Sequence, residues 1–432
     1  MNCSLILLIG TNPLPNYVVA EHLLSKKEPK IDEIWLVHSE KRDSQSGTEK
    51  TADHLKEVVS ARHPEVFFKY CSLSDVGNAG AIERDVKEKM LEHVKEGNIH
   101  LNYTGGTKAM SVHVYRTLEQ FKELQKKTFS YLDARGFVLK KDDERGIVSV
   151  DLRKEVSISL EDLARLHGYE KKSEGKSYYW LDALKIFKDI IAQNELNKFL
   201  EWKRKMIRGL YYDEKGNFIE TRKKMQDRLI KERSLFDEHS FKEKVLPLLQ
   251  AIPDEHSILD ETGQSLWIPD EKTTNECYVT RVKPAVKEFL DGKWLENYVR
   301  MILSEKITDK MIPIEFNWEL RKPEGKEFEL DAIVLNGYQV CGISCTTDAK
   351  EDLCKLKGFE VLHRVDQIGG EEAKAVLITC LTHNHSERRD QVEILEDDLK
   401  YETGGEDKLL VLGIEDLKED NLWKKIKNHI WG

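Results

Sequence analysis

Residues 102–110 read NYTGGTKAM and directly follow an apolar run, so two adjacent glycines separate a strand-like segment from the start of a helix. Glycines let the backbone approach a ligand closely, threonine hydroxyls can donate hydrogen bonds, and a lysine in the first helical turn adds positive charge. Such groups beside the N–H groups of a helix start suit a phosphate ester. A tight threonine-capped turn without a ligand is the alternative. The residues concerned are Thr104, Gly105, Gly106, Thr107 and Lys108.

Two further polar loops follow apolar runs in the same part of the chain. TNPLPN at 11–16 follows SLILLIG, and SEKRDSQS at 39–46 follows DEIWLVH. The carboxyl ends of parallel strands open on one edge of a sheet, so we expect these loops to lie beside 102–110. In the first of these loops, Thr11, Asn12 and Asn16 offer polar groups.

The elements that would position these loops alternate between short apolar runs and stretches of helical composition. Continuous apolar strands separated by helices predict a parallel sheet covered on both faces, which is a Rossmann-like, doubly wound domain. The predicted strands are 4–10, 32–38, 65–71, 98–104 and 127–133. The predicted helices lie around 16–26, 48–62, 80–96 and 107–126.

A strand-end NxTGGTKxM in a Rossmann-like amino-terminal domain resembles the CARF domain of CRISPR ancillary effectors. The resemblance implies that the domain binds cyclic oligoadenylate and that the protein is a homodimer, with the ring lying across the two-fold axis. It also implies the ligand-binding residues, which are Asn102, Thr104, Gly105, Gly106, Thr107, Lys108 and Met110, with Thr11, Asn12 and Ser39 from the neighbouring loops.

The middle of the chain, about 155–290, is rich in charge and predicts long helices. Residues 198–233 contain twelve Lys or Arg against six Asp or Glu, although the whole chain has a net charge of −10. This excess is typical of a solvated helix face, and it would also suit a strip that guides a phosphate backbone. LEDLARLHGYE at 160–170 predicts a helix that ends at Gly168 and connects two domains.

The carboxyl-terminal part contains a helix, KWLENYVRMIL, followed by strands near 312–320, 327–335 and 338–345. Asn336 and Gly337 predict a tight hairpin turn between the last two of these strands. By the two-residue period of a strand, Glu329 and Asp331 lie on one face. Two neighbouring carboxylates indicate a divalent cation or a local lysine partner, or else a solvated edge.

The order helix, acidic strand, hairpin strand, helix resembles the PD-(D/E)XK restriction-endonuclease-like fold. KWLENYV followed by ELDAIVLNGYQVCGISC is similar to the CARF-linked CRISPR ancillary nucleases. The resemblance implies a metal-dependent endonuclease of type III CRISPR antiviral defence that cuts DNA, RNA or both and is activated by cyclic tetra-adenylate. Under it Asp331 holds Mg²⁺ or Mn²⁺, Glu296 is a supporting carboxylate, and Glu329 is a further acidic candidate.

The sequence departs from that family at the strand that usually carries Glu-x-Lys, where it has Ser344, Cys345 and Thr346. One interpretation is that the catalytic groups have migrated to the next helix, where Lys355 and Glu360 would restore the charges of the site. Lys350 and Lys357 are alternative cations on the same segment. The other interpretation is a catalytically inactive cyclic-oligoadenylate sensor that binds nucleic acid or a partner.

The composition argues against several other classes of protein. A pI near 5.9 argues against a protein that coats nucleic acid over its whole surface. Seven scattered cysteines without a CxxC pair suggest neither a disulfide framework nor a zinc site, and they favour a reducing cytoplasm. No apolar run is long enough to predict a membrane span. HNH at 383–385 lacks the surrounding pattern of the nuclease motif of that name.

We therefore predict an α/β protein in three parts. Residues 1–152 form the CARF sensor, 153–288 form a mainly helical linker region, and 289–432 form the nuclease-like domain.

Overall fold

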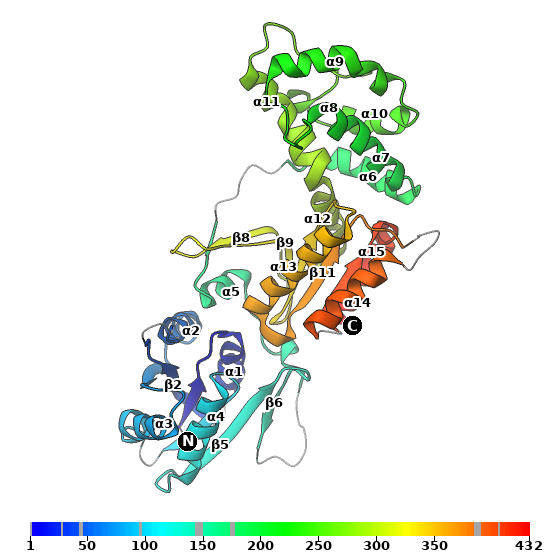
Figure 1. Cartoon of the computed structure of the whole chain (residues 1–432). Helices are drawn as coiled ribbons and strands as arrows, with labels where there is room; N and C mark the ends of the chain where they lie inside the picture. The colour runs from blue at the N-terminus through cyan, green and yellow to red at the C-terminus, as the bar shows by residue number, and fades with distance from the viewer. Residues whose placement is uncertain are drawn as a thin grey trace. The chain divides into compact units, whose positions relative to one another are not determined.

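The computed structural model describes residues 2–26, 29–42, 46–94, 97–142, 150–172, 178–383, 390–404 and 407–432 (Figure 1). The chain divides into two compact units. The first unit comprises Met1–Lys172, Met311–Gly342 and His363–Lys374, and the second comprises Ser173–Lys310, Ile343–Leu362 and Ala375–Gly432.

The amino-terminal sheet has the strand order β3-β2-β1-β4-β5-β6. Neighbouring strands from β3 to β5 run parallel, and only the edge strand β6 is antiparallel to β5. The chain therefore builds outwards from β1 in both directions, as in a doubly wound fold. The strands are β1 (Asn2–Leu8), β2 (Lys30–Ser39), β3 (Phe67–Leu73), β4 (Asn98–Asn102), β5 (Lys126–Asp133) and β6 (Val138–Lys141).

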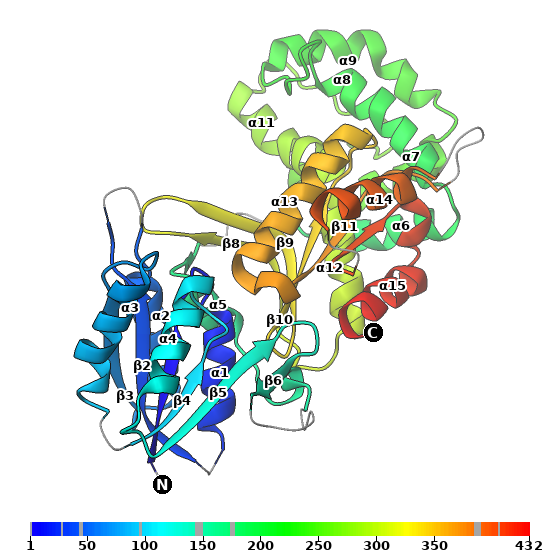
Figure 2. The same cartoon turned by 60° about the horizontal axis from the view of Figure 1, so that its bottom comes forward.

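Helices cover both faces of this sheet. On one face an apolar cluster joins the sheet to α3 (Ala79–Val86), η1 (Lys87–Leu91) and α4 (Lys108–Gln120). This cluster includes Leu8 of β1, Leu101 of β4 and Met110 of α4, all nearly or fully buried. The other face carries α1 (Leu14–Leu24) and α2 (Glu49–Arg62), and α2 also contacts α5 (Leu160–Leu166) (Figure 2).

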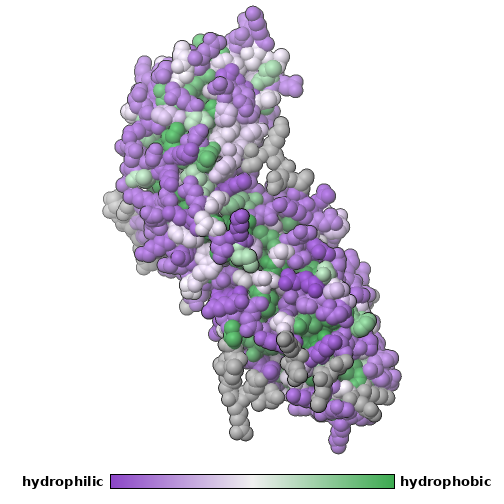
Figure 3. Space-filling model, turned by 180° about the vertical axis from the view of Figure 1, so that it is seen from behind, coloured by the Kyte–Doolittle hydropathy of each residue, from purple (hydrophilic) through white to green (hydrophobic). Residues whose placement is uncertain are grey.

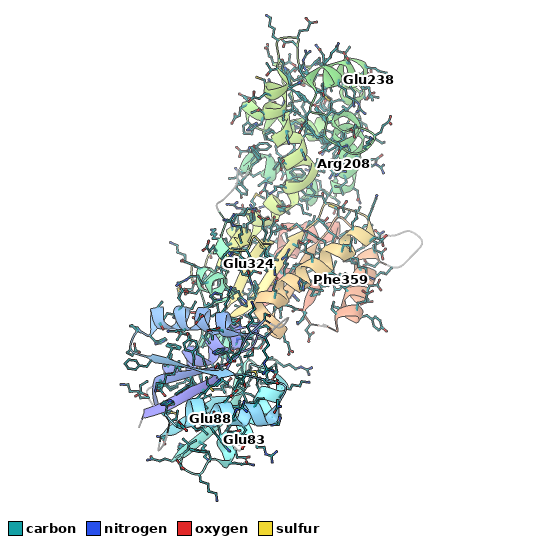
Figure 4. The ribbon with its side chains drawn as sticks, turned by 60° about the vertical axis from the view of Figure 1, so that its left-hand side comes forward. Glu83, Glu88, Arg208, Glu238, Glu324 and Phe359 are labelled. Carbon is teal, nitrogen blue, oxygen red and sulfur yellow. The ribbon has the colours of Figure 1, made fainter. Side chains whose placement is uncertain are left out.

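The segment between the two sheets is helical, as predicted, and belongs mainly to the second unit. Arg208 and Glu238 mark it in Figure 4. Its elements after η2 (Leu152–Lys154) and α5 are α6 (Leu181–Ala192), α7 (Leu196–Trp202), η3 (Lys203–Arg208), α8 (Gly209–Tyr211), α9 (Arg222–Asp237), α10 (Lys242–Gln250), η4 (Asp254–His256), α11 (Asn275–Lys283) and η5 (Pro284–Lys293). Gly168 follows α5 with φ +69, which fits the predicted helix end.

The second sheet has the order β12-β11-β10-β9-β8-β7. Strands β7 to β9 pair antiparallel, whereas β11 and β12 pair parallel. Gly337 lies between β9 and β10 with φ +63, as the Asn-Gly turn predicts. The elements are β7 (Glu170–Lys171), α12 (Trp294–Lys306), β8 (Ile314–Arg321), β9 (Glu327–Asn336), β10 (Gln339–Cys345), α13 (Glu351–Gly369), η6 (Gly370–Glu372), β11 (Lys374–Ile378), α14 (Gln391–Thr403), β12 (Leu409–Leu412), η7 (Ile414–Leu417) and α15 (Glu419–Trp431).

The predicted α/β class and the predicted parallel amino-terminal sheet are confirmed. The prediction omitted β6, β7, β12, α14 and α15. The strands among these are short, and short apolar runs carry little periodic signal. Hydrophilic side chains spread over the face drawn in Figure 3, with smaller hydrophobic patches between them. No helix among the described residues is long and apolar enough to cross a membrane.

Candidate functional site

The carboxyl ends of β1 and β4 lie side by side, because these two strands are neighbours at the point where the strand order reverses. In open parallel sheets, ligands bind in the crevice outside such a point, because the flanking loops diverge there. The loop after β1 begins at Ile9, and the loop after β4 contains 104–107. The structure therefore brings together two of the three loops that the sequence selected.

Close packing at this edge explains the two glycines. A Cβ atom on Gly105 would lie 2.1 Å from the carbonyl oxygen of Leu8, which is closer than any real contact. Gly106 has φ +75, a conformation that side-chain-bearing residues rarely adopt. A Cβ on Gly10 would lie 3.1 Å from the backbone nitrogen of Gly106, so the two loops are in contact. Only glycine fits at 105, and the loop shape is therefore set by its backbone.

Asn16 supports this arrangement from α1. Its side chain is fully buried, and its Nδ2 donates to the carbonyl oxygen of Leu8 over 3.1 Å. Its Oδ1 faces Gly105 and has no hydrogen-bond partner among the described residues. The sequence showed Asn16 only as one polar residue among several, because its burial depends on the packing of α1 against the sheet.

Most polar side chains of the motif are used to hold the loop. Thr104 Oγ1 accepts a hydrogen bond from the backbone nitrogen of Leu132 over 2.7 Å, and Thr107 Oγ1 caps α4 by accepting from Met110 N over 3.2 Å. Asn102 is fully buried, and its Nδ2 donates to Ser130 Oγ on β5. Met110 is buried in the core. These residues therefore hold the loop at 103–107 in place, and direct contact with a ligand stays a prediction for each.

Lys108 differs from its neighbours. It is exposed in the first turn of α4 and has no ion-pair partner among the described residues. Its ammonium group is therefore available to a phosphate, and the N-terminus of α4 adds its own partial positive charge. Thr11 is also exposed at this edge.

The loop after β2 is closed by a hydrogen-bonded pair. Ser39 N donates to Thr48 Oγ1 over 3.0 Å, and Thr48 N donates to Ser39 Oγ over 3.1 Å. Thr48 Oγ1 in turn donates to the carbonyl oxygen of Ile9 over 3.1 Å, which joins this loop to the β1 loop. Ser39 is thus placed at the predicted edge, whereas Thr48 was not selected from the sequence.

The acidic candidates of the second sheet lie in different surroundings. Glu329 is exposed on β9 and is directly opposite Glu319 of β8, so its face of the hairpin is solvated there. Asp331 is half-buried on β9, and Glu296 is half-buried on α12. Glu360 is exposed on α13, the helix marked by Phe359 in Figure 4. Among the described residues, no group of three or more metal-ligating side chains forms a preformed metal site.

Lys355, the predicted migrated cation, is bound by two carboxylates of another helix. Its Nζ lies 3.1 Å from Asp398 Oδ2 and 2.8 Å from Glu402 Oε1, both on α14. The hydrogen bonds that Lys355 donates to Glu402 and to Asp398 raise its pKa, in that order of size, so the ammonium stays protonated. These contacts fit a lysine that fastens α13 to α14.

Several cations of the basic stretch 198–233 form ion pairs or hydrogen bonds within the second unit. Asp291 of η5 is the main acceptor: Arg208 Nε donates to Oδ1 over 2.7 Å, and Tyr212 OH donates to Oδ2 over 2.8 Å. Buried Lys203 donates to the Asp291 carbonyl oxygen, and burial lowers the pKa of this lysine. Other cations of the stretch bonded to protein acceptors are Lys198, Lys205, Arg222, Arg228 and Arg233.

His383, the first residue of the HNH triplet, lies between two carboxylates. Its Nδ1 bonds to Asp390 and its Nε2 to Asp416 Oδ2 over 2.8 Å. Asp416 is buried and also receives Lys425 Nζ at 2.7 Å. The two histidine nitrogens point to different carboxylates, so this cluster is a structural bridge. The other two residues of the triplet lie outside the described part of the chain.

The strand order and the covering helices define a Rossmann-like domain. Residues 4–148 match the family model of the Card1 CARF domain, so the chain carries a CARF domain. A search of curated proteins gave no match.

Two solved structures are similar to almost the whole chain. Protein VC1899 from Vibrio cholerae has a TM-score of 0.61 and 16% identity, with 98% of this chain and 97% of that chain covered. Can2 from Sulfobacillus thermosulfidooxidans, in complex with cyclic tetra-adenylate, has a TM-score of 0.57 and 13% identity, with 98% and 99% covered. At such identities these similarities show a shared fold.

Proposed function

We propose that this protein is a cyclic-oligoadenylate sensor of type III CRISPR antiviral defence that acts as a homodimer. Cyclic tetra-adenylate is the proposed ligand, since it is bound by Can2, a protein of the same fold. The proposal places the ring at the edge formed by the loops after β1 and β4.

The observation that carries this proposal is the glycine-lined edge with one exposed cation. Gly105 and Gly106 are half-buried at positions where the surrounding atoms or the backbone conformation disfavour a side chain, and exposed Lys108 has no carboxylate partner among the described residues. A phosphodiester needs N–H donors and positive charge at close range, and this edge offers both.

For the second sheet we propose a metal-dependent endonuclease that cuts DNA, RNA or both. The support is the resemblance of the helix, acidic strand and hairpin strand to PD-(D/E)XK nucleases, with Asp331 half-buried on β9. Asp331 and Glu296 have the hard oxygen donors that Mg²⁺ or Mn²⁺ prefers, and such ions are often held by one or two carboxylates and completed by phosphate and water. A bound cation would supply Lewis-acid chemistry at the scissile phosphate.

A non-cutting sensor is the second candidate, and one observation favours it. Lys355 is held by Asp398 and Glu402, and Thr346 stands where the family has its strand lysine. If no other cation takes that role, the second sheet binds nucleic acid or a partner without cleaving it.

Two measurements on the full-length protein separate these proposals. Calorimetry with cyclic tetra-adenylate, and with linear tetra-adenylate as control, tests the sensor: absence of binding to the ring would refute it. Incubation of plasmid and single-stranded RNA with protein, ligand and Mn²⁺ or Mg²⁺ tests the nuclease. Ligand binding without cleavage of either substrate would leave the non-cutting sensor as the function.

A further inference from the structure

We infer that Gly370, directly after α13, positions Asn12 in the ligand loop, so that ligand occupancy and the position of α13 are coupled. This inference rests on the proposed sensor function, because it concerns the regulation of the same edge.

The contact is direct and lies within the first compact unit. Gly370 has φ +75, and a Cβ atom there would lie 2.7 Å from Asn12 Nδ2. The amide group of Asn12 therefore packs against the backbone of Gly370. The oxygen of the same amide group is also fixed, because Asn12 Oδ1 accepts a hydrogen bond from the backbone nitrogen of Leu14 over 3.0 Å. One side chain thus joins the start of α1, the ligand loop and the end of α13.

The segment that carries Gly370 is itself held in place. Gln339 is buried, and its Nε2 donates to the carbonyl oxygen of Glu372 over 2.8 Å. Arg153 Nη1 donates to Gln339 Oε1 over 2.9 Å, and its guanidinium lies 3.8 Å from the ring centre of Phe137. This chain of contacts runs from the residues after the first sheet to η6. Gly370 is therefore part of an ordered connection.

The helix before Gly370 can carry a displacement over a long distance. α13 is continuous from Glu351 to Gly369, which is roughly 28 Å at the rise of an α-helix. It begins six residues after β10, whose last residues occupy the Glu-x-Lys position. A ligand that moves the Asn12 loop would shift α13 at one end, and reciprocity requires that changes at α13 alter ligand affinity.

The test compares two glycine variants of the full-length protein. Gly370→Ala places a methyl group against Asn12, whereas Gly325→Ala places one in open space at a similar φ of +85. Both variants carry comparable backbone strain. We expect Gly370→Ala to weaken cyclic tetra-adenylate binding about fivefold or more, which is a typical coupling, and Gly325→Ala to change it less than twofold. Equal affinities in the two variants would overturn the inference.

A double variant tests whether Asn12 transmits the effect. In an Asn12→Ala background, Gly370→Ala should cause little further loss of affinity, because the group it displaces is absent. An undiminished loss would show that Gly370 acts by another route and would overturn the assignment of Asn12.

Hydrogen exchange on the wild-type protein provides a measurement that needs no variant. The ligand should slow exchange at the amides of 368–373 and leave the 322–326 turn unchanged, and unaltered exchange at 368–373 would overturn the coupling. If the wild-type protein binds no cyclic tetra-adenylate, the proposed function fails and the coupling falls with it. Normal wild-type binding with equal affinities in both glycine variants removes only the coupling.

Discussion

The loop edge of the first sheet and the acidic strand of the second differ in how their groups are assembled. At the first edge, backbone atoms from 105–107 and one cation, Lys108, lie within a single short segment. In the second sheet, the candidate groups Asp331, Glu296 and Lys355 lie on three separate elements, and Lys355 is bound by α14. A local motif can encode a site made of backbone, whereas a site made of distant side chains depends on how each helix packs.

The largest expected effect tests whether the second sheet is an enzyme. If Asp331 binds the metal, Asp331→Asn should lower cleavage about 100-fold or more, because the amide lacks the charge that a divalent cation needs. Cleavage assays with Mn²⁺ measure this, with Glu329→Gln on the same strand as the comparison. Ligand affinity should be unchanged. Retained cleavage in the Asp331 variant would remove this residue from the metal site.

The next effect concerns the loop backbone. Gly105→Ala should destabilise the protein by about 1–3 kcal/mol and abolish measurable ligand binding, because the new methyl group would collide with the Leu8 carbonyl. Urea unfolding and calorimetry report the two effects. Gly80→Ala in the first turn of α3 is the control, since its nearest neighbour would be 3.5 Å away. A Gly105 variant as stable as this control would contradict the packing described above.

A smaller effect is expected at the exposed cation. Lys108→Ala should weaken cyclic tetra-adenylate binding about tenfold, which corresponds to the loss of one charge-assisted hydrogen bond. The melting temperature should not change, because Lys108 makes no ion pair among the described residues. The loss should shrink as salt concentration rises. Unchanged affinity at low salt would exclude Lys108 from the site.

A variant of Lys355 tests whether this residue is a catalytic cation or only joins α13 to α14. Its ion pairs with Asp398 and Glu402 lead us to expect that Lys355→Met changes cleavage less than threefold and slightly lowers the melting temperature. The resemblance to nucleases with a migrated lysine predicts instead a loss of roughly 100-fold. Single-turnover cleavage decides between these values, and the larger loss would restore Lys355 as a catalytic candidate.

The smallest effect is a pH dependence confined to the second unit. Burial opposes the charged form of His383, but its hydrogen bonds to Asp416 and Asp390 outweigh burial and raise its pKa. The bridge therefore contributes its full stability below the unfolded pKa of roughly 6.5 and loses it as pH rises through the folded value. Urea unfolding across this window should show stability falling with pH in the wild type and a flatter profile in His383→Gln. Identical profiles would count against the bridge.

Much of the fold follows from the sequence alone. Five apolar runs separated by helical stretches specified the parallel sheet, because alternation of this kind is compatible with few other arrangements. The Asn-Gly pair specified the β9–β10 turn, and the two glycines of 105–106 specified a loop where side chains cannot fit. Each of these features depends only on residues that are adjacent in the sequence, so the sequence is enough to predict it.

Other features depended on contacts between residues far apart in the chain. The sequence could not show that Thr104 is bound by Leu132, that Lys355 is bound by two residues of α14, or that Asn12 packs against Gly370. In the sequence, each of these side chains looks the same as a side chain that is free to bind a ligand. Its partner is selected only when separate elements pack together, because hydrogen bonds and ion pairs act over a few ångströms. Sequence therefore determined where the two-glycine loop lies, and tertiary structure decided which of its polar groups remain available.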